Sequence, residues 1–201
     1  MLCLIQCGET AWESEERIHG STDIPLSEAG RLAVTADVQR MKTDRVAMVH
    51  HPNDEAATDT AQAVARKLGA KTKGVAELAD PNMGLLEGLH REEFAERYPS
   101  RFRQWVDEPM MLTPPEGENL AEASSRILGT IAHLLKRSRS EEVAIVLHPL
   151  ALGMARCWFG ARRSNDLWLM LKNRPRIERY AMTAKLVSDM EQAAAAIVAP
   201  S

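Results

Sequence analysis

Short apolar runs, separated by segments with helical periodicity, constrain the fold of this chain more than any other feature. Leu2–Gln6 and Arg45–Val49 have the length and composition of buried strands, and Ser27–Met41 between them has the apolar spacing of a helix. This order predicts parallel strands joined by a helical crossover. Val143–Leu147 predicts a further central strand. We therefore expect a three-layer α/β/α fold with a mostly parallel central sheet.

Residues with capping chemistry predict where helices begin and end. Pro52 and Asp54 begin a helix that Gly69 ends, and Asn119 with Glu122 has the pattern of a capping box before a long helix. Between about residues 80 and 116 prolines and glycines interrupt the periodicity, which indicates a helical subdomain inserted over the sheet. We expect one domain spanning residues 1–201.

Composition and charge exclude several classes of function. Of 201 residues 45% are hydrophobic and 26% are charged, as in globular domains, and the formal net charge is −3. This near neutrality gives no basic surface for nucleic acid or a membrane. The three cysteines lack the spacing of a disulfide framework, which favours a reducing compartment. We expect a soluble, cytoplasmic protein without nucleic-acid or membrane partners; its oligomeric state is open.

Four side chains that could take part in catalysis or bind a ligand lie at the ends of predicted strands. They are Cys7, His50, His51 and His148. Because ligands of open α/β sheets collect at the carboxyl ends of the strands, we expect a site at this edge.

Motifs along the chain occur with the spacing of one known family. The first group is Leu4–Trp12, Arg17–Gly20, Asp23–Ser27 and Gly30. Together these segments resemble the opening signature of the histidine phosphatase (phosphoglycerate mutase-like) superfamily, which usually reads Arg-His-Gly-Glu-Thr, Trp-Asn, Arg-x-x-Gly and Asp-x-Pro-Leu-Ser/Thr. Further segments are similar to the family's acid-bearing segment, its Gly-Glu-Ser-Leu and its second-histidine strand: Leu78–Gly88, Gly117–Leu120 and Val143–His148.

The resemblance implies a phosphoryl-transfer site. In the family the first histidine is phosphorylated, two arginines and the second histidine hold the phosphate, and an acid protonates the leaving group. The equivalent catalytic positions here are Cys7, Asp80 and His148, and the resemblance places the substrate-binding positions at Gln6, Glu13, Thr22, His50 and Ala56.

The departures from the family pattern concern the residues that hold the phosphate. They are Gln6 for arginine, Cys7 for histidine, Glu13 for asparagine, Ala56 for the second arginine, Asp80 for glutamate and Pro149 for glycine. Each lost guanidinium removes charge-assisted hydrogen bonds of roughly 1.5–3 kcal/mol. A carboxylate about 4 Å from a phosphate oxygen repels it by about 4 kcal/mol at an effective dielectric near 20. We therefore expect a protein inactive as phosphatase or mutase that acts in binding or regulation of a small molecule or protein.

Other interpretations of the same residues stay open. Cys7 is either a small buried hydrophobe or a thiolate nucleophile activated by His148, with Asp80 as orienter or acid. Cys7 and His148 could also join Asp80, His50 and His51 as zinc ligands, although one histidine could instead cap the following helix. We expect no resident cofactor or metal. Arginines from elsewhere could enter the pocket, and the candidates are Arg91, Arg101, Arg103, Arg162 and Arg163.

Overall fold

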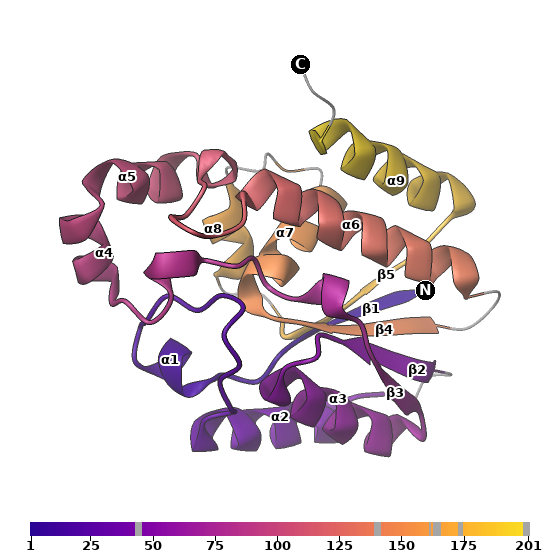
Figure 1. Cartoon of the computed structure of the whole chain (residues 1–201). Helices are drawn as coiled ribbons and strands as arrows, with labels where there is room; N and C mark the ends of the chain where they lie inside the picture. The colour runs from indigo at the N-terminus through magenta and orange to yellow at the C-terminus, as the bar shows by residue number, and fades with distance from the viewer. Residues whose placement is uncertain (43–45, 139–141, 161, 163–165, 173–174, 199–201) are drawn as a thin grey trace.

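The fold is a twisted five-stranded sheet between two layers of helices (Figure 1). The computed structural model describes residues 1–42, 46–138, 142–160, 162, 166–172 and 175–198. The strand order is β3-β2-β4-β1-β5, with β5 antiparallel to β1 and the other pairings parallel. The strands are β1 (Leu2–Gln6), β2 (Val46–His51), β3 (Lys71–Gly74), β4 (Glu142–Leu147) and β5 (Ile177–Tyr180). The expected α/β fold with a mostly parallel sheet is therefore confirmed.

Helices α2 and α3 cover one face of the sheet, and α6, α7 and α9 lie over the other (Figure 1). Helices α1, α4 and α5 lie beyond the carboxyl ends of the parallel strands. The bounds are α1 (Ala11–Ser14), α2 (Glu28–Arg40), α3 (Glu55–Leu68), α4 (Arg91–Arg97), α5 (Pro99–Asp107), α6 (Leu120–Arg137), α7 (Pro149–Phe159), α8 (Leu167–Leu171) and α9 (Ala184–Val198), with 3-10 turns η1 (Ala76–Leu78), η2 (Gly84–Leu86) and η3 (Pro109–Met111).

The predicted helix boundaries are confirmed by their capping contacts. Asp54 Oδ1 accepts a hydrogen bond from Ala57 N at 2.8 Å at the start of α3. Gly69 ends that helix in the left-handed conformation, with φ of 67°, which residues with a Cβ adopt only at a cost. Asn119 Oδ1 accepts from two backbone amides in the first turn of α6. The backbone of α3 is thus fixed directly beside the carboxyl end of β2.

The core forms on both faces of the sheet. Small residues of α3, including Ala57, Ala61 and Val64, are buried against β1 and β4, whereas α6 buries larger residues such as Ile127 on the opposite face. Burying one such large aliphatic side chain contributes about 1.5–3 kcal/mol. The two layers therefore hold β1 and β4 rigidly, and these are the strands that carry the candidate site.

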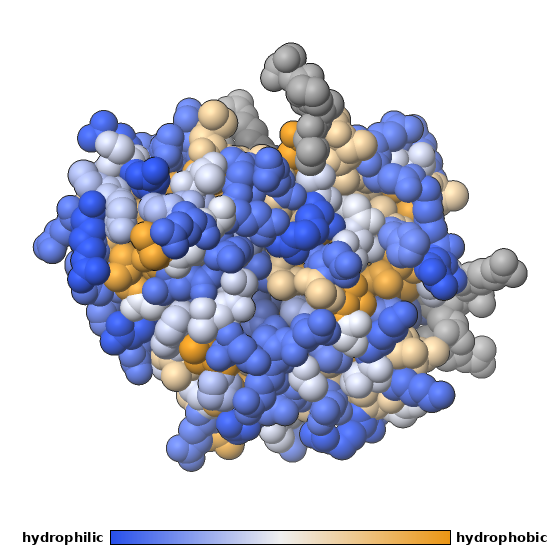
Figure 2. All heavy atoms as spheres, viewed as in Figure 1, coloured by the Kyte–Doolittle hydropathy of each residue, from blue (hydrophilic) through white to orange (hydrophobic). Residues whose placement is uncertain are grey.

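The surface is mainly hydrophilic on the face shown in Figure 2, where hydrophobic residues occur in small separate groups. Within the described part of the chain, no helix has both the length and the hydropathy needed to cross a membrane.

Candidate functional site

The register of β1 and β4 brings the two central residues of the site together. Gln6 pairs with Leu147 in the parallel ladder, and Cys7 N donates to Leu147 O at 2.8 Å. Cys7 and His148 therefore leave the sheet at the same edge and next to each other.

Cys7 packs against α3 and is 2% exposed. Its Sγ lies 3.6 Å from Thr60 Oγ1, and Thr60 Oγ1 donates its own hydrogen to Ala56 O at 2.8 Å. Gly8 N also donates to Thr60 Oγ1, at 3.1 Å. Because the single hydroxyl hydrogen is committed to Ala56, the thiol is the donor in the contact between Cys7 and Thr60. This arrangement suits a structural cysteine.

His148 is 2% exposed, and its partner is Asp54 rather than the acidic residue that sequence reasoning selected. His148 Nε2 lies 2.9 Å from Asp54 Oδ1. Burial lowers the pKa of His148, but the interactions with Cys7, Asp54 and Asp80 outweigh it, so this pKa lies well above its usual value. Burial raises the pKa of Asp54, but His148 outweighs this effect and the pKa is lowered. The two side chains form a partly buried ion pair.

The carboxylate of Asp80 binds backbone amides at the start of α7. Its carboxylate accepts from Leu150 N at 3.3 Å and from Ala151 N at 2.8 Å. Pro149, the first residue of α7, has no N–H to offer. Burial raises the pKa of Asp80. A helix N-terminus is a ready anion site, and here a side chain of the protein already fills it.

Glu13 and His19 complete the cluster around His148. Glu13 Oε2 accepts from Thr10 N at 2.7 Å in the capping box of α1. The His19 and His148 rings lie 5.0 Å apart, centroid to centroid. One ligand atom from each of Glu13, His19 and His148 lies within 4.8 Å of the other two. The sequence does not single out His19 as a site residue, because no local pattern places it beside a histidine that is distant in the chain.

Two cavities adjoin this cluster and share His19 and Asp80 in their linings. One of about 410 Å³ also contacts Glu13, Arg17 and Arg91. The other, of about 280 Å³, has His148 in its lining. Its remaining polar lining is Ser21, Thr22, Asp23, Asn53 and Asp54. Carboxylates therefore line both cavities.

Three arginines near the cluster are engaged in contacts with other groups of the protein. Arg17 donates to Glu15 Oε2 at 2.7 Å and to Gly88 O at 2.8 Å. The Arg91 guanidinium lies over the Phe102 ring, 5.4 Å from its centroid. Arg176 donates to Cys7 O at 3.0 Å but is paired with Asp37 at 2.6 Å.

The other arginines considered from the sequence either lie away from the cluster around His148 or fall outside the described residues. Arg101 and Arg103 are exposed on α5, and Arg162 lines a different cavity. Arg163 falls outside the described residues.

Three of the remaining predicted substrate-binding positions are held by contacts within the protein or are buried. Gln6 N donates to Arg176 O at 2.7 Å. Thr22 donates through its hydroxyl to Glu87, and Ala56 is fully buried in α3. Thr22 and Glu13 therefore line the two cavities, whereas Ala56 faces the core.

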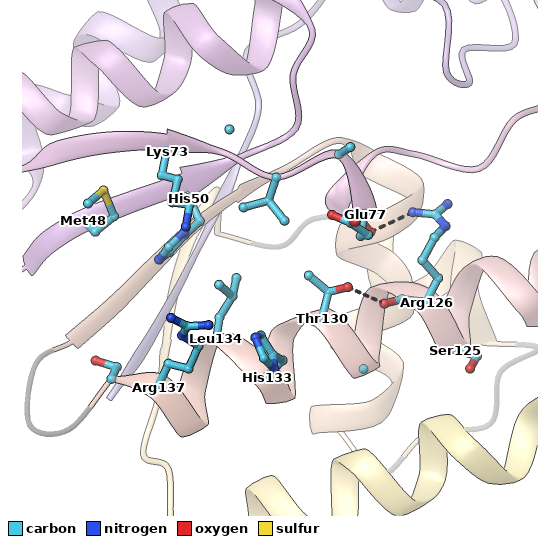
Figure 3. A pocket seen from close by; sticks show the side chains of 15 residues that line it. Met48, His50, Lys73, Glu77, Ser125, Arg126, Thr130, His133, Leu134 and Arg137 are labelled. Carbon is cyan, nitrogen blue, oxygen red and sulfur yellow. Dashed lines mark hydrogen bonds between the residues drawn. The ribbon is translucent and has the colours of Figure 1, made fainter.

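The structure does not assemble the alternative zinc site considered from the sequence, whose ligands would be Cys7, His148, Asp80, His50 and His51. His50 lines a separate cavity of about 820 Å³ between the sheet and α6, together with Lys73, His133 and Arg137 (Figure 3). His51 Nδ1 lies 2.6 Å from Pro52 O. Successive residues of a strand face opposite sides of the sheet, so both histidines cannot enter one site. Burial and the charge of Lys73 lower the pKa of His50. The helix cap expected of a histidine is supplied by Asp54.

Comparison with known proteins assigns the family. The model of the histidine phosphatase superfamily (branch 1) matches residues 2–183. Because this match covers most of the sequence, the chain belongs to the histidine phosphatase superfamily.

Two relatives named as enzymes and one solved structure share between 26% and 29% of the aligned residues with this chain. A probable phosphoglycerate mutase, GpmB, of Citrobacter koseri is 29% identical over 150 residues, which cover 75% of this chain and 70% of that protein. Phosphoserine phosphatase 1 of Hydrogenobacter thermophilus is 26% identical over 156 residues, covering 78% and 74%. The solved structure of Bacillus stearothermophilus YhfR is 26% identical with a TM-score of 0.78, covering 87% of this chain and 84% of that one.

Proposed function

We propose that this protein does not transfer phosphoryl groups by the histidine phosphatase route and that its cleft instead serves in binding or regulation. The observation that carries the proposal is that carboxylates of the protein occupy the groups on which a phosphate would depend. Asp80 binds the N-terminal amides of α7, and Asp54 binds His148. Glu13 adds a third carboxylate within reach of the same histidine.

The energetics of an incoming phosphate are unfavourable in this cleft. The phosphate would have to displace Asp80 from the helix N-terminus, where a charge contributes about 0.3–1 kcal/mol and more when buried. It would also meet Glu13 and Asp54, and each carboxylate at about 4 Å repels it by about 4 kcal/mol at an effective dielectric near 20. A protonated His148 offers a positive charge against these, but that charge is already paired with Asp54. Arg17 and Arg91 line the neighbouring cavity but are engaged with Glu15 and Phe102.

Turnover of a panel of phosphomonoesters tests the proposal. The panel holds p-nitrophenyl phosphate, phosphoserine and 3-phosphoglycerate, with wild type, Cys7→Ala and His148→Ala compared at equal concentration. We expect wild-type turnover to be the same as that of both variants and of a blank. Turnover that disappears in either variant would show that the cleft still performs phosphoryl transfer.

A second candidate is an enzyme that uses Cys7 and His148 on a small, less anionic substrate. It is favoured by the interactions of His148 with Cys7 and with Asp54, because nucleophile, base and orienter then follow in the order of a catalytic triad. Hydrolysis of p-nitrophenyl acetate and of a thioester tests it, with Cys3→Ser as the matched control because Cys3 is equally buried on β1. Hydrolysis lost only in Cys7→Ser would support this candidate, and equal rates would remove it.

A cytoplasmic location belongs to the proposal as well. Cys3, Cys7 and Cys157 are buried, and none of them lies in a disulfide within the described residues, which fits a reducing compartment.

A further inference from the structure

Imidazole nitrogens without hydrogen-bond partners gather at the centre of the cleft. Both ring nitrogens of His19 and Nδ1 of His148 are buried and have no partner. Neutral imidazole carries one donor and one acceptor nitrogen, and buried polar atoms in native proteins almost always have partners. These histidine nitrogens are therefore available to a ligand that the protein alone does not supply.

A carboxylate faces the same point. Glu13 uses Oε2 to cap α1, which leaves Oε1 with its lone pairs. The ligand atoms of Glu13, His19 and His148 lie within 4.8 Å of one another. Around a tetrahedral zinc ion with bonds of 2.0–2.2 Å, ligand atoms are separated by about 3.3 Å. The three ligand atoms would therefore have to approach one another by at most about 1.5 Å to reach that spacing.

Asp54 supports His148 in the way that outer carboxylates support metal ligands. It holds Nε2 at 2.9 Å, which leaves Nδ1 as the free nitrogen and fixes the orientation of the ring. Asp54 is itself held as the N-cap of α3, so the ring is anchored to a helix. A metal-binding histidine commonly donates its second N–H to a carboxylate in this manner.

We propose that Glu13, His19 and His148 form a binding site for a divalent transition-metal ion of the Zn²⁺ class, at the place where the family holds phosphate. Two histidines and one carboxylate are a donor set typical of zinc and leave further coordination positions open. The cavities of about 410 and 280 Å³ adjoin these residues and give the open positions access to water or a small ligand. This proposal departs from the prediction made from the sequence, which was that the protein holds no resident metal. It rests on the proposed function, because it needs a cleft that phosphate does not occupy.

The experiment titrates chelator-treated, full-length protein with Zn²⁺ by calorimetry and with Co²⁺ by visible absorption. We expect one ion per chain, Co²⁺ bands of low coordination number, and a rise in melting temperature with Zn²⁺. His19→Ala and Glu13→Gln should each weaken Zn²⁺ affinity at least tenfold, and Glu13→Gln keeps an oxygen that can cap α1. His133→Ala is the matched control, since His133 is an exposed histidine of α6 and its affinity should equal wild type.

Asp54→Asn provides a second test that does not depend on removing a ligand. Asparagine caps a helix about as well as aspartate, so α3 should remain intact. We expect Zn²⁺ affinity to fall about tenfold to a hundredfold and the Co²⁺ spectrum to shift, which a purely structural residue would not cause. Zn²⁺ binding that is absent in wild type, or unchanged in His19→Ala, overturns the metal site. Phosphomonoester turnover by metal-free protein would instead overturn the proposed function, so the two failures are distinguishable.

Discussion

The thiol of Cys7 occupies a place where the family has a nucleophilic histidine, yet its contacts are those of a core residue. It donates to Thr60, lies against α3 and is almost fully buried. A nucleophile must be reached by its substrate, and the linings of the two cavities of the cleft consist of other residues. At the scale of this residue, packing therefore accounts for the observed geometry.

Thiol accessibility is the corresponding prediction. Cys3, Cys7 and Cys157 are all buried, and burial with the nearby Asp166 raises the pKa of Cys157 to about 11. We expect a disulfide reagent at pH 8 to label none of the three thiols in native protein within minutes and all three in guanidinium chloride. A single fast-reacting thiol that is lost in Cys7→Ser, but kept in Cys3→Ser, would contradict the core role of Cys7.

The carboxylate of Asp54 has two structural roles, because Oδ1 caps α3 and also binds His148. Asp54→Ala removes the cap, at about 0.5–2 kcal/mol, and leaves His148 without its partner, at about 1–3 kcal/mol. We expect the free energy of unfolding in urea to fall by about 2–3 kcal/mol. Asp54→Asn keeps the cap and should lose less than about 1 kcal/mol. Equal losses in the two variants would contradict this division, because they would show that the cap, which asparagine keeps, contributes nothing.

At the scale of elements, Glu87 ties the loop that carries His19 to the segment around η2. Its carboxylate accepts from Ser21 N at 2.8 Å and from Met83 N at 2.9 Å. A Cβ on Gly20 would lie 2.2 Å from Glu87 Oε1, so only glycine allows this close approach. The position of His19 in the cleft therefore depends on a carboxylate from a distant segment.

The pH dependence of stability tests this link. Burial raises the pKa of Glu87, but the hydrogen bonds from Thr22, Ser21 and Met83 outweigh it and the pKa is lowered. A carboxyl group with a lowered pKa in the folded state stabilises the protein above its unfolded pKa, near 4.3, and this contribution is lost as the pH falls through the folded value. Glu87→Gln should lose about 1 kcal/mol at pH 7, a value reduced by partial exposure. The difference from wild type should shrink below about pH 4, and a difference that stays constant with pH would contradict the role.

At the scale of the whole molecule, local patterns predicted the sheet but not the centre of the cleft. The apolar runs identified β1, β2 and β4, and the residues Asp54, Gly69 and Asn119 marked helix ends. Cys7 and His148 could be placed at one edge because parallel strands end together.

Two features depended on tertiary structure instead. His148 pairs with Asp54, 94 residues away, and meets His19 on a loop whose path Glu87 determines. His50 and His51 end the same strand, so its exact register decided which face each joined. The catalytic and binding roles assigned to these positions remain predictions.

The affinity of the cleft for a tetrahedral anion tests the central claim most directly. Calorimetric titration of metal-free wild type with vanadate, an analogue of the transferred phosphoryl group, should show binding weaker than about 1 mM, because carboxylates fill the sites that an anion needs. His148→Ala should behave in the same way. Micromolar binding of vanadate to the wild type, abolished in His148→Ala, would contradict the account.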